Sequence, residues 1–136
     1  MVKKSQITGM RGVFLAAAYL SKLGFVVSPT SRNTAGADLL VTDQDCTRAM
    51  TVQVKANAKS SSFWLVGKEA VNLVSSTHFY VLVNGCDGDE AEYFVVPSRV
   101  VAKRTRKIQR PNSVWYSIRL KDINAYRSKW KAFGSP

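Results

Sequence analysis

Three polar side chains, Asp38, Gln53 and Lys55, fall at the ends of two strand-like runs of Leu, Val, Met and Thr. Asp38 opens the first run, Gln53 and Lys55 close the second, and a polar turn from Asp43 to Cys46 separates the two. Such runs joined by a polar turn predict a β-hairpin. Because one arm of a hairpin starts where the other ends, an acid, an amide and an amine are expected to meet there.

Gln53 and Lys55 are two residues apart, so in a strand their side chains point to the same face of the sheet. This arrangement suits a shared chemical site. A plainer alternative is a structural ion pair between Asp38 and Lys55 at the end of the sheet, which is the usual arrangement for one Asp and one Lys. The elements around the hairpin bear on this choice.

A helix and a strand are predicted before the hairpin. Residues 10–23 have high helix propensity, and Gly24 follows as a residue that commonly ends helices. No charge occurs between Gly12 and Ser21, which predicts a helix that is buried on most of its circumference. Residues 25–28 form a predicted strand. Residues 1–9 are expected to be a basic, poorly ordered lead-in.

Further strands and helices are predicted after the hairpin. The strands are residues 63–66, 79–83, 93–96 and 113–120, and the helices are residues 68–74, a helix from 97 that continues into the basic residues beyond 103, and residues 122–133. The last helix rests on apolar residues spaced by three and four. No linker or repeat divides the chain. We therefore expect a single domain over residues 1–136, of the α/β class, with one mixed central β-sheet flanked by helices.

The composition limits the classes of function. The 136 residues include 20 Lys and Arg against 9 Asp and Glu, a net charge of +11. This excess favours a polyanionic partner such as nucleic acid, with a generally basic, soluble surface as the alternative. A single histidine, His78, and two cysteines without metal-binding spacing argue against zinc and against His-dependent nucleophiles. No secretory signal or membrane-spanning run is evident, so we expect a cytoplasmic protein.

Candidate nucleic-acid contacts fall in three places. They are Arg99, Lys103, Arg104, Arg106, Lys107 and Arg110 after the strand at 93–96, Lys59 and Ser60 after Lys55, and Arg32 and Asn33 before Asp38. Dense positive charge is unfavourable unless it is solvated or matched by phosphates. Among the tryptophans, Trp64 is the best candidate for stacking on a base, although core packing is favoured over stacking even there. Trp115 fits either role, and Trp130 fits the apolar face of the last helix.

The order of these elements, with an acid opening the second strand and Gln-x-Lys closing the third, resembles the PD-(D/E)xK nuclease superfamily. It is most similar to restriction-endonuclease-like and Holliday-junction-resolvase-like members, in which Gln can occupy the (D/E) position. The resemblance covers residues 10–96. It implies hydrolysis of DNA phosphodiesters with Mg²⁺ or Mn²⁺, with Asp38 as the metal-binding acid, Gln53 in the second acid position and Lys55 as the catalytic lysine. Relatives often form homodimers, so a homodimer is expected too.

These residues suit the implied chemistry. A hard divalent cation takes oxygen ligands, which Asp38, the amide oxygen of Gln53 and the backbone carbonyl of Val54 would supply. Lys55 would orient or help deprotonate the attacking water and would balance charge on the phosphate.

One position departs from the family pattern. Many relatives carry a Glu directly after a Gly in the first helix, whereas this chain has the step Gly12-Val13, and a valine cannot bind a metal. Most of the other acids fall in predicted turns. Glu69, which follows the Gln-x-Lys strand, is a candidate displaced acid, with a solvated charge on a helix surface as the alternative.

Three hypotheses follow. The first is a DNA-acting protein of nuclease-like fold, in which metal-dependent hydrolysis is intact, weakened or lost. It is expected to recognise DNA structure or ends rather than a long sequence, because no helix suited to reading the major groove is evident. The second is a catalytically inactive nucleic-acid-binding module of the same fold. The third is a basic protein-interaction domain.

Overall fold

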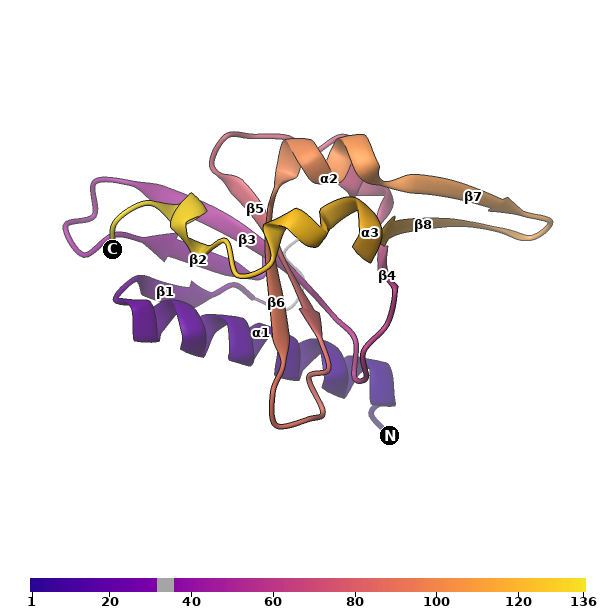
Figure 1. The fold of residues 1–136 in the computed structure, drawn as a ribbon, viewed down its shortest axis with the longest axis horizontal. Helices are drawn as coiled ribbons and strands as arrows, with labels where there is room; N and C mark the ends of the chain where they lie inside the picture. The colour runs from indigo at the N-terminus through magenta and orange to yellow at the C-terminus, as the bar shows by residue number, and fades with distance from the viewer. Residues whose placement is uncertain (32–35) are drawn as a thin grey trace.

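The computed structural model describes residues 1–31 and 36–136, and its strands form two sheets (Figure 1). The central sheet has the order β1-β2-β3-β5-β6. Its strands are β1 (Val26–Pro29), β2 (Leu39–Thr42), β3 (Ala49–Ala56), β5 (His78–Asn84) and β6 (Glu92–Pro97). Strands β3 and β5 are parallel and the other neighbours antiparallel, which confirms a mixed α/β architecture and the predicted hairpin β2–β3.

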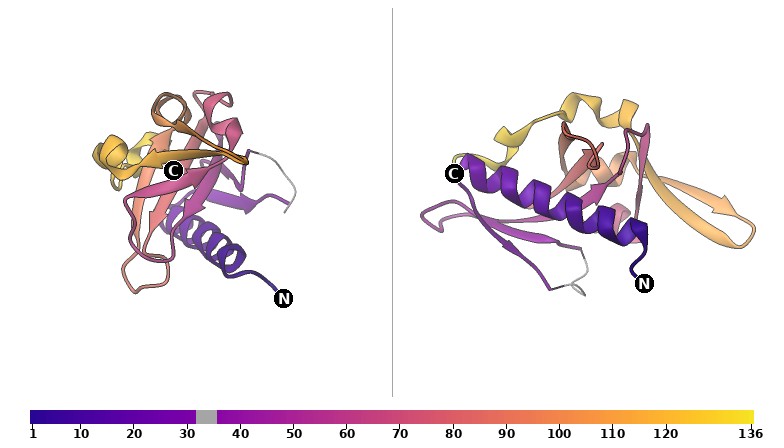
Figure 2. Two further views of the ribbon diagram at one scale, coloured as in Figure 1. Left: turned by 90° about the vertical axis from the view of Figure 1, so that its right-hand side faces the viewer. Right: turned by 90° about the horizontal axis from the view of Figure 1, so that it is seen from below.

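The second sheet has three antiparallel strands in the order β4-β8-β7. They are β4 (Phe63–Val66), β7 (Arg106–Arg110) and β8 (Ser113–Arg119). The predicted mixed central sheet flanked by helices is confirmed, but the strands expected at 63–66 and 113–120 lie in this second sheet instead. Strand β4 cannot join the central sheet beside β3 because β2 and β5 already occupy both edges of β3. It pairs instead with β8, and the β7–β8 hairpin extends away from the body of the molecule (Figures 1 and 2).

Helix α1 (Lys4–Leu23) lies along one face of the central sheet (Figure 2). It begins within the segment predicted to be a disordered lead-in, because the Gln6 side chain accepts a hydrogen bond from the Lys3 N–H at 3.0 Å and caps the first turn. Only the stripe Thr8, Gly12, Ala16 and Leu20 is fully buried, so the prediction of burial on most sides is wrong. A helix lying on a sheet is covered along one stripe only.

Gly12 allows α1 to approach the end of β3 closely. A Cβ atom at this position would lie 2.5 Å from the Cβ of Ala56, well inside van der Waals contact. The glycine therefore brings the N-terminal half of α1 against the strand that carries Gln53 and Lys55. Gly24, with φ of +109°, ends the helix as predicted.

The central sheet has a hydrophobic core on each of its two faces around β5 and β6, whereas Val26 of β1 and Leu40 of β2 are exposed. One core packs α1 and the C-terminal segment against side chains such as Val52, Val54 and Val81, and the other packs the second sheet and α2 (Ser98–Arg104) against Tyr80, Leu82 and Phe94. All of β5 is buried. Its His78 is 4% exposed and its Nδ1 contacts the Thr51 hydroxyl at 2.6 Å, so the chain's single histidine has a structural position. No helix in the described ranges is long and apolar enough to cross a membrane.

The three later helices are shorter than predicted. Helix α2 ends at Arg104 because the basic residues that follow pair with β8 as β7, and residues 68–74 contain only the 3₁₀ turn η1 (Lys68–Val71). The C-terminal segment is broken into α3 (Leu120–Ile123), η2 (Asn124–Tyr126) and η3 (Trp130–Phe133). Contacts with β6 cause this break: Ser128, with φ of +52°, donates its N–H to the Tyr93 carbonyl at 2.8 Å, and Arg127 pairs with Glu92.

Candidate active site

The structure brings Asp38, Gln53 and Lys55 into one pocket at the open end of the β2–β3 hairpin. The register pairs Leu39 with Val52, so Asp38, one residue further toward the open end, stands across from Gln53. Lys55 follows on the same face of β3. The hairpin geometry that the sequence predicts is therefore present.

Asp38 is held in place by the backbones of both neighbouring segments. Its N–H donates to the Val52 carbonyl at 2.7 Å, and its own carbonyl accepts from the Thr30 N–H at 2.9 Å. Its Oδ2 accepts a hydrogen bond from the Val54 N–H at 2.8 Å. One carboxylate oxygen is thus committed to β3, and no other described residue donates to the second oxygen, Oδ1.

Lys55 does not form the structural ion pair considered as an alternative. The ion pairs within residues 1–31 and 36–136 join Arg11 to Asp87, Arg119 to Asp122, and Arg127 to Glu92. The half-buried Lys55 and Asp38 share the pocket without being joined to each other. Within the described residues, the structure therefore does not support the ion-pair alternative.

Oxygen-bearing residues of the pocket are of the kind that a hard divalent cation takes as ligands. The candidate donors are the Oδ1 of Asp38, the amide oxygen of the nearly buried Gln53, and the backbone of Val54, all of which line the same pocket. Oxygen donors are those that Mg²⁺ and Mn²⁺ prefer. No group of three or more His, Cys, Asp or Glu in the described part of the chain is placed to hold a metal ion, so the donor set carries little charge.

Helix α1 forms one wall of the pocket through Gln6, Gly9, Met10 and Val13. Val13 is thus part of the pocket. Gln6 was not among the predicted site residues. Gln6 lies seven residues before Val13, so both are on the same face of the helix. The sequence predicted a helix that begins only at residue 10, and for this reason Gln6 was missed.

Glu69, the predicted displaced acid, does not line the pocket. The side chain is half-buried on η1, and its carboxylate folds over Gly67, where a Cβ atom would collide with it. Tyr80 pairs with Gln53 between β3 and β5. Burial, followed by the charges of Glu69 and Asp38, raises the pKa of Tyr80 to about 12. Both carboxylates therefore lie near one buried phenol.

Two asparagines anchor the loop that carries Lys59 and Ser60, both of which are exposed. Asn57 Nδ2 donates to the Phe63 carbonyl and to Asn84 Oδ1, both at 2.9 Å, and Asn84 Nδ2 donates to a further loop carbonyl at 2.8 Å. Asn84 is 2% exposed. In the sequence, Asn84 precedes Gly85 in a pattern typical of a turn, so its role in anchoring the loop could not be predicted.

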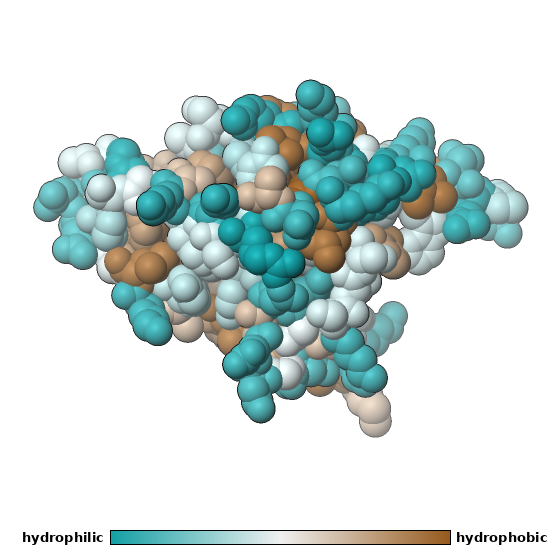
Figure 3. Space-filling view, in the orientation of Figure 1, coloured by the Kyte–Doolittle hydropathy of each residue, from teal (hydrophilic) through white to brown (hydrophobic). Residues whose placement is uncertain are grey.

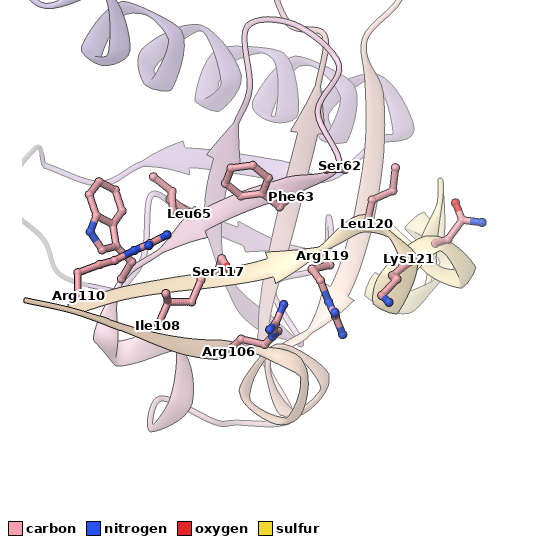
Figure 4. Close-up of a pocket in the computed structure, with 12 residues that line it drawn as sticks. Ser62, Phe63, Leu65, Arg106, Ile108, Arg110, Ser117, Arg119, Leu120 and Lys121 are labelled. Carbon is pink, nitrogen blue, oxygen red and sulfur yellow. The ribbon is translucent and has the colours of Figure 1, made fainter. Parts of the chain in front are cut away.

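The remaining basic candidates lie away from the pocket. Arg32 and Asn33 fall outside the described residues. Arg99, Lys103 and Arg104 are exposed on α2, and Arg106, Lys107 and Arg110 are exposed on β7. Arg106 and Arg110 line a second groove over the β4-β8-β7 sheet (Figure 4), whereas Lys107, between them in sequence, points to the opposite face.

The tryptophans take different roles from one another. Trp64 is 1% exposed and donates its indole N–H to the Val83 carbonyl at 2.9 Å, so it is a core residue and packing is confirmed over stacking. Trp130 is buried against Tyr19, with ring centroids 4.5 Å apart. Trp115 is 46% exposed. The ambiguous tryptophan of the sequence is the exposed one.

Comparison with solved structures identifies the fold. No protein-family model matches the sequence, and a search of curated proteins gives no significant match. The structure superposes on the Holliday junction resolvase Hjc of Archaeoglobus fulgidus with a TM-score of 0.63 and 13% identity, covering 94% of this chain and 97% of the resolvase. It superposes on a bacterial homing endonuclease with a TM-score of 0.61 and 18% identity, covering 95% and 90%. The chain therefore has the restriction-endonuclease-like fold that these two structures share.

Proposed function

We propose that this protein binds DNA and hydrolyses its phosphodiester bonds with Mg²⁺ or Mn²⁺ in the pocket of Asp38, Gln53 and Lys55. The observation that supports this most is the placement of an acid, an amide and an amine in one pocket without an ion pair between them. The net charge of +11 suits a DNA partner. The two structural neighbours are named as a junction resolvase and a homing endonuclease.

Each pocket residue has a role in this proposal. Asp38 Oδ1, the Gln53 amide oxygen and the Val54 carbonyl would hold the cation, while Asp38 Oδ2 keeps the carboxylate fixed on β3. When bound, the cation polarises the phosphate and increases the acidity of a coordinated water. Lys55 orients the attacking water through its ammonium group and balances the negative charge that develops on the phosphate. Half-burial strengthens this electrostatic contribution because nearby water is displaced.

A single carboxylate in the pocket predicts weak cation binding, and Val13→Glu tests this directly. Val13 already lines the pocket, so a glutamate there adds a second negative oxygen ligand. Ligand charge is a main determinant of divalent-ion affinity. We expect Mn²⁺ affinity, measured by calorimetric titration, to rise by about tenfold, and cleavage in low Mg²⁺ to rise with it.

Val13→Gln is the matched control, because glutamine has the size of glutamate without its charge. It should leave Mn²⁺ affinity close to that of the wild type and share any loss of packing. Equal Mn²⁺ affinities for the two variants would contradict the position of the cation beside Val13.

The proposed function is tested with the full-length protein on supercoiled, linear and branched DNA in Mg²⁺, Mn²⁺ or EDTA. We expect nicking or cutting in the metal ions and none in EDTA, with branched DNA or DNA ends preferred. Binding that weakens steeply with salt, without any cutting in either metal, would identify the inactive binding module instead. Absence of DNA binding at low salt would leave only a protein-interaction domain.

A further inference from the structure

The outer face of the second sheet differs from an ordinary solvent-exposed sheet face. Strands β4 and β8 bury Trp64, Val66 and Ile118 in the core, so the alternate residues point outward. Such outward positions are normally polar. Here they combine apolar and cationic side chains, namely Phe63, Leu65, Trp115, Arg106, Arg110 and Arg119, which line one groove (Figure 4).

The apolar members of this groove are exposed in contiguous strands. Phe63 is 44%, Leu65 47% and Trp115 46% exposed, and the indole N–H of Trp115 donates to the Ser113 hydroxyl at 2.8 Å, which fixes one edge of the ring. Hydrophobic residues are visible among hydrophilic ones around the base of the β7–β8 hairpin (Figure 3). Exposed apolar groups that cluster in this way mark a binding surface.

The charge of the groove determines which partner fits. Its lining contains Arg106, Arg110, Arg119 and Lys121 but no acidic residue, and among these cations only Arg119 has an acidic partner in the described ranges, Asp122 at 2.9 Å. A second copy docking the same face symmetrically would bring these cations against their own equivalents, which is unfavourable. A polyanion carries the complementary charge.

The aromatic residues narrow the partner to unpaired bases. In duplex DNA the flat faces of the bases are stacked on one another and cannot be reached, whereas in a single strand they stack on exposed aromatic side chains. Arg106 and Arg110, on β7 along the edge of the same groove, are placed to contact the phosphates of the same strand. We propose that the outer face of the β4-β8-β7 sheet binds single-stranded DNA, with bases stacked on Trp115 and Phe63 and phosphates bound by Arg106 and Arg110.

The groove is continuous with the candidate active site. Phe63 and Leu65 line both the groove and the pocket of Asp38 and Lys55. A strand bound on the outer face therefore leads into the pocket. If the proposed function holds, the substrate is therefore DNA with an unpaired segment beside the bond that is cut. This consequence rests on the proposed function, whereas single-strand binding itself does not.

The first test measures binding alone, with wild-type protein in EDTA. Trp64 and Trp130 are buried, so quenching of the intrinsic fluorescence by a short oligothymidylate reports mainly on Trp115. We expect saturable quenching and at least tenfold tighter binding of the oligothymidylate than of a duplex of the same length. Equal affinity for duplex and single strand would overturn the inference.

The second test uses Trp115→Ala and Phe63→Ala, followed by anisotropy of a labelled oligothymidylate. Loss of one stacking side chain weakens single-strand binding by roughly tenfold. Val114→Ala is the matched control, because Val114 is 42% exposed on the same strand but points to the opposite face. The affinity of this variant for the oligothymidylate should equal that of the wild type. Equal affinities of Trp115→Ala and Val114→Ala would overturn the inference, as would a dimer that dissociates in Trp115→Ala without loss of single-strand affinity.

Binding in EDTA does not depend on hydrolysis, so the two proposals fail separately. If the protein binds single strands through Trp115 but never cuts DNA, the stacking surface is supported and the proposed function is contradicted. If the protein cuts DNA but shows no preference for single strands, the proposed function is supported and the stacking surface is contradicted.

Discussion

Lys55→Met is expected to lower the rate of DNA cleavage by roughly 100-fold to 1000-fold, the range found when one preorganised group that stabilises transition-state charge is removed. Methionine keeps an unbranched apolar side chain in this half-buried position, so the fold and the Mn²⁺ affinity should be retained. Asp38→Asn should abolish cleavage as well, but through loss of cation binding, because the negative charge is removed. The fold should be retained, because the amide oxygen of asparagine can still accept the hydrogen bond from the Val54 N–H. Single-turnover cleavage and calorimetric titration with Mn²⁺ distinguish the two effects.

Lys68→Met is the control for Lys55→Met. Lys68 is exposed on η1, outside the pocket of Asp38, and its loss removes the same charge from the protein. We expect a change in cleavage rate within about threefold, which reflects only weaker attraction to phosphates. Cutting that survives both Lys55→Met and Asp38→Asn would show that the hydrolytic site lies elsewhere.

Trp64→Ala is expected to lower the free energy of unfolding by about 3–5 kcal/mol, the usual cost of deleting a buried Trp or Phe side chain. Trp64 is 1% exposed, packs edge-on against Phe94 with centroids 5.5 Å apart, and satisfies the buried Val83 carbonyl. For a domain of this size the melting temperature should fall by about 10–20 °C. Urea denaturation monitored by circular dichroism measures the loss.

Trp115→Ala provides the comparison for Trp64→Ala, because it removes the same side chain from an exposed position. Its cost should stay below about 1 kcal/mol, as for most surface substitutions. If the two alanine variants were equally destabilised, the assignment of Trp64 to the core and Trp115 to the surface would be wrong. A folded Trp115→Ala variant also ensures that any loss of single-strand binding reflects the missing ring.

Local patterns were enough to predict the part of the fold that positions the pocket. The β2–β3 hairpin is short-range, so alternating apolar residues and one polar turn determine which side chains meet, and Asp38 and Gln53 stand across from each other as expected. Helix α1 and the buried strand β5 also follow from local propensity and an unbroken apolar run. The restriction-endonuclease-like fold could therefore be inferred from residues 10–96.

The second sheet could not be predicted, because its pairing is long-range. Strand β4 pairs with β8 across about fifty residues of chain, and nothing in the four residues Phe63–Val66 specifies that partner. The apolar spacing of residues 122–133 predicted a helix, yet the hydrogen bond of Ser128 to Tyr93 and the pairing of Arg127 with Glu92 break it. Tertiary contacts thus outweighed local preference in the C-terminal third.

The same long-range pairing explains why the sequence left the position of Trp115 open. In a strand, whether a residue points inward or outward depends on which face of the sheet is covered, and the sequence alone does not show which face of β4 or β8 that is. Trp64 and Trp115 both follow polar loops or turns, and both have apolar residues directly before and after them. Only the packing of the second sheet onto Tyr80, Leu82 and Phe94 makes one a core residue and the other a surface residue.

The division of the chain into two sheets has an evolutionary consequence. The cation donors and Lys55 come from residues 38–55, whereas most of the outer groove comes from β4, β7 and β8. Substitutions on the projecting hairpin can therefore accumulate without altering the chemistry of hydrolysis, and the reverse holds for the hairpin β2–β3. Under the two proposals, substrate preference and catalytic competence would be inherited on different stretches of the chain, so a lineage could change one while it keeps the other.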